Sequence, residues 1–263
     1  MQVITSVSKR VGNGTTRPFF ATCEDERLYI VKAQNMYTFN HKAEFNEAIG
    51  YRFARLLELP IPNAKIVNLP QEIIDSKDEL QEIEVVPGPC FASEYHKGSI
   101  LSSPILFNCC VNPEDIPSFF LFDQLILNDD RGANDGNLYF DQHTRKAMLI
   151  DQSNIFKNAL VWTADELLSY QKIPPVTVPI EGRIYKYMKS FVNGNSPFAK
   201  ISDKLDTITA NDISGLFADI PLEWSIDKKE IAACNSFLLF QVQHYKEILQ
   251  KIRPDFTSWK GDV

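Results

Sequence analysis

A polar loop near the middle of the chain carries residues suited to phosphate chemistry. The segment LILNDDRGANDGNLYFDQHTRKAMLIDQSN (125–154) places Asp130 after an apolar stretch, Asn137 seven residues later, and Asp151 fourteen residues after that. Two short strands joined by a turn would bring Asn137 and Asp151 to one end of a hairpin, where two oxygen ligands suit Mg²⁺. Asp130 could then accept or orient the proton of a substrate hydroxyl.

Neighbouring residues compete for these roles. Asn134 and Asp135 are alternatives to Asn137 as metal ligands, although Asn137 directly precedes a strand-like run. Asp129 is an alternative to Asp130. Asp, Asn and Gly also populate ordinary turns, but a turn requires neither an Asp-Arg pair after an apolar helix nor a second Asp at a strand end.

A lysine and a carboxylate form a second pattern. Lys32 follows the apolar run LYIV, and Glu47 lies fifteen residues later on a predicted helix, with Glu44 as a further possibility. A strand lysine paired with a helix carboxylate is held towards nucleotide phosphates in phosphoryl-transfer enzymes. The pair therefore predicts a phosphate-binding lysine.

The turn GNGTTRP (12–18) precedes this lysine. Gly12 and Gly14 permit a tight turn whose backbone N–H groups could cover phosphates, and Arg17 could add a charged fork. A lone Gly-x-Gly is equally typical of a plain hairpin, so its significance depends on the other two patterns.

The N-terminal third of the chain is predicted to be rich in strands. A helix is indicated at 41–57 by the spacing of its apolar residues, and the acidic stretch 71–86 is predicted to be a solvated excursion. Alternating or short apolar runs predict strands at 2–7, 19–23, 28–33, 64–69 and 89–95.

The remainder is predicted to be mainly helical. The segment 112–128 opens with Asn112 as an N-cap and Pro113 at the first helical position, and its apolar interior indicates a buried helix. Asp227 and Glu230 form a capping-box-like start to a later helix. The further elements predicted here are strand-like runs at 137–141 and 147–151 and a helix at 227–252.

These patterns predict an α+β chain of two lobes. A strand-rich lobe covers residues 1–95, a helical lobe covers 96–263, and the two form one catalytic unit around a cleft. With 27 Lys+Arg against 34 Asp+Glu, the chain has a net charge of −7. We expect no nucleic-acid binding, because no excess of positive charge is available to meet a phosphate backbone.

The apolar runs and the cysteines indicate the cellular location of the protein. Runs such as SFFLF (118–122) are far shorter than a bilayer crossing requires, and the first twelve residues show no secretory signal. The five cysteines include no C-x-x-C and suit reduced thiols. We expect a cytoplasmic protein without membrane insertion.

The order of turn, strand lysine, helix glutamate, buried helix, Asp-Arg…Asn loop and strand-end aspartate resembles the protein-kinase-like fold. More narrowly, it resembles the compact single-chain branch of the HipA-like kinases, over about residues 3–155. The segments that carry the resemblance are GNGTTRPFF (12–20), LYIVKAQN (28–35), FNEAIGYRFARLLELPIPNAKIV (45–67), CFASEY (90–95), LILNDDRGANDGNLYF (125–140) and MLIDQSN (148–154).

This resemblance implies ATP- and Mg²⁺-dependent phosphoryl transfer, most readily to a Ser or Thr of a protein. It implies that Asp130, which directly precedes Arg as in the family, is the catalytic aspartate, and that Asn137 and Asp151 bind the metal. An antitoxin-like or regulatory protein partner is also implied. The residues expected to bind ATP are Gly12, Gly14, Thr15, Thr16, Arg17, Lys32 and Glu47, with the backbone near Glu94 and Tyr95 as the adenine-binding hinge.

Some features depart from the family pattern. The loop has two glycines without a third, and Gln152 and Ser153 follow Asp151, which questions an activation-segment switch. Two other readings stay open: a lipid or small-molecule kinase like the phosphatidylinositol kinases, and a pseudokinase that binds nucleotide or a partner. Some HipA-like kinases are silenced by phosphorylation of the glycine loop, so Thr15 or Thr16 could be an autophosphorylation site.

Overall fold

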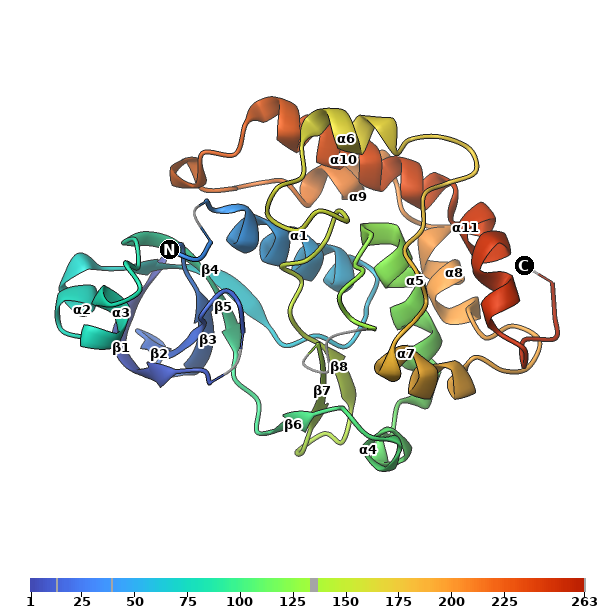
Figure 1. Ribbon diagram of the computed structural model, residues 1–263, viewed down its shortest axis with the longest axis horizontal. Coiled ribbons are helices and arrows are strands. Elements are labelled where there is room, and N and C mark those ends of the chain that lie inside the picture. The colour runs from blue at the N-terminus through green and yellow to red at the C-terminus, as the bar shows by residue number, and fades with distance from the viewer. Residues whose placement is uncertain (13, 39, 133–136, 263) are drawn as a thin grey trace.

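Five N-terminal strands form a closed barrel (Figure 1). The computed structural model describes residues 1–12, 14–38, 40–132 and 137–262. The strand order is β1-β2-β3-β5-β4, and a parallel pairing of Gln2 with Val67 and Val3 with Asn68 closes the barrel. All five predicted strands are confirmed: β1 (Gln2–Arg10), β2 (Phe19–Cys23), β3 (Leu28–Lys32), β4 (Ala64–Leu69) and β5 (Gly88–Glu94).

Two short helices lie against the barrel where a solvated excursion is predicted. They are α2 (Gln71–Asp75) and α3 (Asp78–Gln81). The stretch is acidic and partly exposed, but Ile74, Leu80 and Ile83 are buried in the apolar cluster of the barrel. The prediction is therefore wrong for these three apolar residues, which are buried, while most of the charged residues of the stretch face water.

Helix α1 (Lys42–Leu56) follows β3 as predicted, and its apolar residues pack into the helical lobe as well as against Phe91 of the barrel. Phe45 and Phe53 belong to the large apolar cluster of the helical lobe. Their ring centroids lie 5.8 Å from Trp162 and 6.0 Å from Phe122, respectively. Helix α1 is thus built into the core of the helical lobe.

The buried helix predicted at 112–128 is present as η1 (Pro113–Asp115) and α5 (Ile116–Ile126). Every residue of α5 is buried, which confirms the predicted core. Asn112 occupies the N-cap position of η1 with Pro113 next to it, as predicted, but its side chain makes no capping bond. Its Nδ2 instead donates to the Ala147 carbonyl and its Oδ1 accepts from the Ala147 N–H, so Asn112 joins this helix to strand β8 (Ala147–Leu149).

Strand β8 belongs to a small sheet that ends at the polar loop. Its order is β6 (Gly98–Ile100), β7 (Leu138–Asp141) and β8, with Leu138 opposite Leu149. The residues just beyond the hairpin also meet, because the Ile150 N–H donates to the Asn137 carbonyl at 3.4 Å. The predicted hairpin thus brings Asn137 next to the residue before Asp151.

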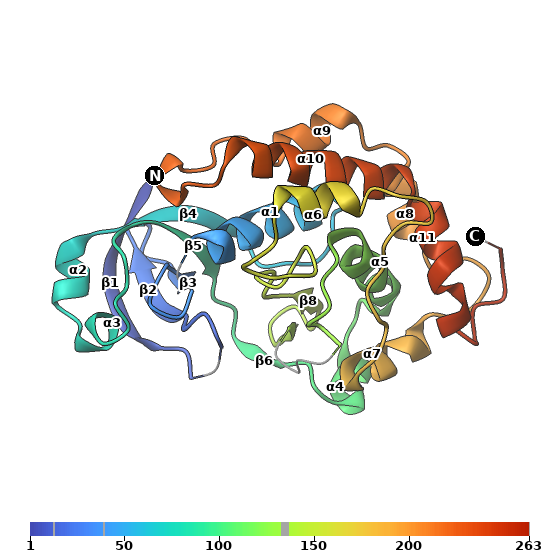
Figure 2. The same cartoon turned by 45° about the horizontal axis from the view of Figure 1, so that its top comes forward.

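The helix predicted at 227–252 is two helices, because the backbone leaves the helical conformation at His244 (φ −117°, ψ 24°). The predicted capping box of Asp227 and Glu230 is confirmed. Figure 2 shows α10 beside α6 along one side of the helical lobe. The remaining helices are α4 (Pro104–Cys109), α6 (Ala164–Ser169), α7 (Arg183–Met188), η2 (Lys189–Phe191), α8 (Ala199–Leu205), α9 (Ala210–Gly215), η3 (Leu222–Trp224), α10 (Lys228–Gln243), α11 (Tyr245–Ile252) and η4 (Arg253–Asp255).

Among the described helices, none combines the length and the apolar character that crossing a bilayer would need.

Candidate active site

A cavity of about 350 Å³ has walls from the barrel, α1 and the β7–β8 hairpin. Its apolar walls include Ile30, Phe91 and Leu149, which could accept a flat base. The predicted site residues that line it are Gly12, Gly14, Lys32, Glu47, Asn137 and Asp151.

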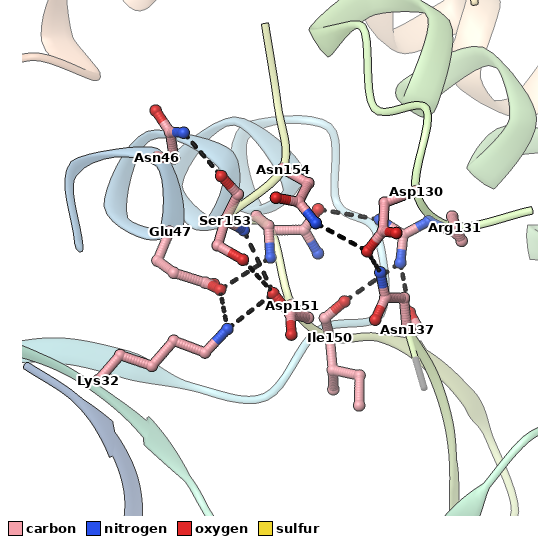
Figure 3. Close-up of polar contacts among 11 residues, drawn as sticks. Lys32, Asn46, Glu47, Asp130, Arg131, Asn137, Ile150, Asp151, Ser153 and Asn154 are labelled. Carbon is pink, nitrogen blue, oxygen red and sulfur yellow. Dashed lines mark hydrogen bonds and ion pairs between the residues drawn. The ribbon is translucent and has the colours of Figure 1, made fainter. Parts of the chain in front are cut away.

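Lys32 lies at the centre of a charged cluster in this cavity (Figure 3). Its Nζ is 2.5 Å from Glu47 Oε1 and 2.7 Å from Asp151 Oδ1. Strand β3 and helix α1 therefore meet through a lysine–glutamate pair, as the spacing predicts. The structure also brings Asp151, from 119 residues further along the chain, to the same ammonium group.

The charges of this cluster support one another. Burial lowers the pKa of Lys32, but Asp151 and Glu47 outweigh it, and the net shift is upward. Burial raises the pKa of Asp151, but the adjacent Lys32 charge and hydrogen bonds bring it well below its usual range. Burial raises the pKa of Glu47, although Lys32 opposes this. Lys32 is thus held as a cation and Asp151 as an anion.

Asp151 is held by its own local backbone as well as by Lys32. It has a left-handed φ of 57°, a rare conformation for a residue with a side chain. The Ser153 hydroxyl and N–H both donate to Asp151 Oδ1, at 2.6 and 3.3 Å. Next to it, the Gln152 N–H donates to Glu47 Oε1 at 3.0 Å. Three of the hydrogen bonds that organise the cluster thus come from Gln152 and Ser153, the residues directly after Asp151.

Asp130 is oriented by two amide side chains. Its Oδ2 accepts from Asn137 Nδ2 and from Asn154 Nδ2, both at 2.8 Å. Figure 3 shows this group beside the Lys32 cluster. The three predicted polar residues of the loop and hairpin are therefore brought to one region.

Arg131 holds the polar loop in place from the protein interior. Its side chain is fully buried, and its Nε lies 2.8 Å from both oxygens of Asp123. Its Nη1 donates to the carbonyls of Asn137 and Ile150. Arg131 therefore fixes the ends of both hairpin strands, which is a structural task.

The glycine turn contributes only part of its length to the cavity. Thr15, Thr16 and Arg17 are not among the lining residues. Thr16 is 7% exposed and its carbonyl accepts from Asn35 Nδ2, while the Arg17 guanidinium lies 4.7 Å from the Tyr37 ring centroid. Their contacts with ATP stay predictions. Phosphorylation of Thr16 would require this turn to open.

The predicted hinge lies at the end of β5. The Glu94 N–H donates to the Asn63 carbonyl, and the Tyr95 N–H donates to the Leu28 carbonyl. Neither Glu94 nor Tyr95 lines the cavity. Ser93 does line it. The adenine contact at Glu94 and Tyr95 stays a prediction.

Oxygen ligands for a divalent cation are available in the cavity. Asp151 keeps 30% of its side chain exposed. Because Asn137 Nδ2 donates to Asp130, the amide presents its Oδ1 on the other side. One carboxylate and one amide oxygen suit Mg²⁺, which takes its remaining ligands from water and phosphate. The rival ligands Asn134 and Asp135 lie outside the described residues.

Several residues of this site are not identified by the sequence analysis. They are Asn46, Gln152, Ser153 and Asn154, which bind to or beside the predicted residues. The signal for three of them is the polar run DQSN, which directly follows an apolar strand. Short polar side chains at such a point readily bond to nearby backbone and carboxylates.

The fold is that of the protein kinases. A proinflammatory kinase of Helicobacter pylori, CtkA, superimposes with a TM-score of 0.55 at 13% identity, over 94% of this chain and 97% of its own. A Golgi casein kinase with Mn and ADP bound gives a TM-score of 0.53 at 12% identity, over 100% of this chain and 76% of its own. These low identities establish the shared fold alone.

The family follows from the sequence. The model of the HipA-like kinases matches residues 4–170, which is more than half of the chain. The protein therefore belongs to the HipA-like kinase family and is a kinase by fold and family, as the resemblance implies. Among curated proteins, no sequence matches it.

Proposed function

We propose that this protein transfers the γ-phosphoryl group of ATP, bound with Mg²⁺, to a Ser or Thr hydroxyl of a protein. The observation that carries the proposal is the convergence of Lys32, Glu47, Asp151 and Asn137 at one cavity, with Asp130 bonded to Asn137. Phosphoryl transfer depends mainly on positioning and on neutralising charge, and this arrangement offers both.

Each residue has a task that its position supports. Lys32, held as a cation by two carboxylates, would bind the phosphates. Asp130, oriented by Asn137 and Asn154, would orient the acceptor hydroxyl and take its proton. Asn137 and Asp151 would hold the metal, which when bound supplies positive charge to the transferring phosphoryl group.

Two further features support nucleotide binding. The apolar walls from Ile30, Phe91 and Leu149 provide a surface for an adenine ring. The similar fold of the Golgi casein kinase was solved with Mn and ADP bound, which supports a nucleotide and a divalent cation here. An antitoxin-like or regulatory partner and a cytoplasmic location stay predictions of the sequence.

The test is a transfer assay. The purified protein is incubated with labelled ATP and Mg²⁺, and label is measured in the protein itself, in lysate proteins and in phosphoinositide vesicles. We expect label on protein Ser or Thr, and its loss in Asp130→Asn and Asp151→Asn. Label that survives both substitutions would contradict the site. Label only in lipid would favour a lipid kinase, and tight ATP binding without transfer would favour a pseudokinase.

A further inference from the structure

One polar side chain of α1 links this helix to the segment after Asp151. Asn46 is fully buried, and its Nδ2 donates to the carbonyls of Ser153 and Ala159 at 2.7 and 2.9 Å. Its Oδ1 accepts from Trp162 Nε1 at 3.0 Å. Figure 3 shows Asn46 reaching towards Ser153 from the same helix that carries Glu47. One amide thus holds three points of the segment 151–162.

Two residues near the start of α1 extend this contact. Lys42 Nζ donates to the Trp162 carbonyl and to Glu230 Oε1, at 2.5 and 2.7 Å, and lies 4.1 Å from the Trp162 ring centroid. Asn40 Nδ2 donates to the Leu160 carbonyl at 3.1 Å. Because Glu230 belongs to α10, the segment 151–162 is held between α1 and the helical lobe.

Close backbone packing completes the contact near Glu47. A Cβ at Gly50 would lie 2.6 Å from the Cβ of Gln152, closer than real Cβ contacts allow. Only a glycine lets α1 approach the segment so closely. At this approach, the Gln152 N–H reaches Glu47 Oε1.

The segment itself has a strained backbone. Asp151, Phe156, Lys157 and Ala159 have left-handed φ values of 57°, 62°, 70° and 50°. Residues with a Cβ rarely adopt this region, and such conformations persist where surrounding contacts hold them. Asn46 binds carbonyls within this stretch, so it is placed to hold the strained form.

The C-terminal half of α1 is also fixed to the helical lobe. Arg52 Nη1 donates to the carbonyls of Leu216 and Ala218 at 2.7 and 2.6 Å, and Phe53 packs beside Phe122. A swing of α1 that separated Glu47 from Lys32 would have to break these contacts together with those of Asn46.

We propose that Asn46 is a positioning residue that fixes α1 to the segment 151–162 and so keeps Glu47 on Lys32. This arrangement needs no phosphorylation of residues 155–182, the chain between the proposed metal-binding hairpin and helix α7. This proposal rests on the proposed kinase function. It implies that the site is already in its active arrangement. Transfer then requires nucleotide and acceptor, but no prior modification of residues 155–182.

The first test is a double-mutant cycle between Asn46 and Glu47. We expect Asn46→Ala to lower kcat roughly 10- to 100-fold, because small misplacements of catalytic groups have effects of this size. In the Glu47→Gln background, the same change should add little, because Asn46 acts through Glu47. An equal loss in both backgrounds, or no loss in either, would overturn the proposal.

A matched control and a milder variant separate positioning from folding. Asn158 belongs to the same segment but donates to Glu166 Oε1, so Asn158→Ala should keep wild-type kcat. Trp162→Phe keeps a ring and removes the bond to Asn46, so it should lower kcat less than Asn46→Ala and speed hydrogen exchange in α1. Wild-type rate and exchange in Trp162→Phe would count against the proposal, even if Asn46→Ala fails to fold.

The second test concerns modification. Mass spectrometry of active protein should find Thr163, Ser169 and Thr177 unmodified, and phosphatase treatment should leave kcat unchanged. Loss of transfer after phosphatase, with phosphate found on this segment beforehand, would overturn the proposal. If the wild-type protein transfers no phosphate at all, the proposed function fails. Hydrogen exchange of α1 in Asn46→Ala against Asn158→Ala then still decides whether Asn46 holds the helix.

Discussion

Two carboxyls one helical turn apart on α1 have very different surroundings. Glu47 and Glu44 lie three residues apart and are 3% and 0% exposed. Glu47 is bonded to Lys32 and to the Gln152 N–H. Neither oxygen of Glu44 has a hydrogen-bond partner among the described residues, and His41 Nδ1 is 3.8 Å away. Burial is common to both carboxyls, so the partners decide which one serves the site.

The surroundings of Glu44 keep this carboxyl protonated at mildly acidic pH. Burial raises the pKa of Glu44 to about 7 and lowers the pKa of His41 below its usual value. The nearby thiol of Cys90 also has a raised pKa, again because of burial. Burial raises the pKa of Glu47 as well, but Glu47 is bonded to Lys32, which is held as a cation, and Asp151 beside Lys32 is held as an anion.

The largest expected effect on activity comes from removing the charged partners near Glu47. Lys32→Met and Asp151→Asn should each lower phosphoryl transfer by about 10³-fold, because each removes a preorganised charge from the reacting phosphates. The measurement is kcat/KM for ATP. Lys65→Met is a matched control, since Lys65 lies on the barrel and pairs with Asp25. A similar loss in Lys65→Met would show that the effect is not specific to the cavity.

The pH dependence of the free energy of unfolding should report the titration of Glu44. Because the folded pKa of Glu44 is raised from 4.5 to about 7, its contribution to stability is full below about pH 4.5 and is lost as pH rises through 7. The loss amounts to about 3 kcal/mol at 1.36 kcal/mol per pKa unit. Urea unfolding of wild type and Glu44→Gln between pH 5 and 8 measures it.

Subtracting the stability of Glu44→Gln from that of wild type isolates the contribution of Glu44. His41 changes stability with pH in the opposite direction, but it does so in both proteins. Stability curves that stay parallel across this range would contradict the assignment.

The activities of Glu47→Gln and Glu44→Gln test the comparison of these two carboxyls directly. Glu47→Gln should lower transfer by about 10²-fold, because Lys32 loses a charged partner. Glu44→Gln should keep a rate near that of wild type, because Glu44 does not contact Lys32. If Glu44→Gln is the more damaging variant in a steady-state assay, the roles of the two carboxyls must be exchanged.

The smallest expected effect tests the close packing of α1. Gly50→Ala should cost about 1–3 kcal/mol of stability, because its Cβ would overlap Gln152. Gly215→Ala at the end of α9 meets no atom within 4 Å and should be neutral or stabilising by up to about 1 kcal/mol. Chemical unfolding compares the two. A stable Gly50→Ala protein would mean that the segment can move away from α1.

Much of the fold could be predicted because its elements have clear periods. The barrel strands alternate and α1 follows helical spacing, so their bounds agree with the structure within a few residues. The pairing of Lys32 with a carboxylate of this helix is predicted from the strand-lysine and helix-carboxylate pattern of phosphoryl-transfer enzymes. Helical spacing adds nothing to that choice. It cannot choose between Glu44 and Glu47, because both lie on buried parts of one helix and only the tertiary partners differ.

Other parts of the site have no local signal. Asn46 stands between an aromatic residue and an acid, and its partner Trp162 lies 116 residues away. Arg131 could have been assigned a structural role, because Asp123 lies within the apolar run SFFLFDQLIL (118–127). A buried carboxylate requires a partner, and the structure supplies Arg131 and the Tyr185 hydroxyl.

The acidic helices beside the barrel have a consequence for solubility. Strand β1 pairs with β4 only at Gln2 and Val3, so the later part of this strand is an edge. There, Glu79 of α3 accepts the Arg10 N–H at 3.1 Å, and Glu79 and Glu82 lie within 4 Å of the Arg10 guanidinium. An exposed strand edge is a template for pairing with another chain, and charged covers prevent this. The stretch 71–86 thus covers this edge of the barrel with charged side chains, which should disfavour pairing with another chain.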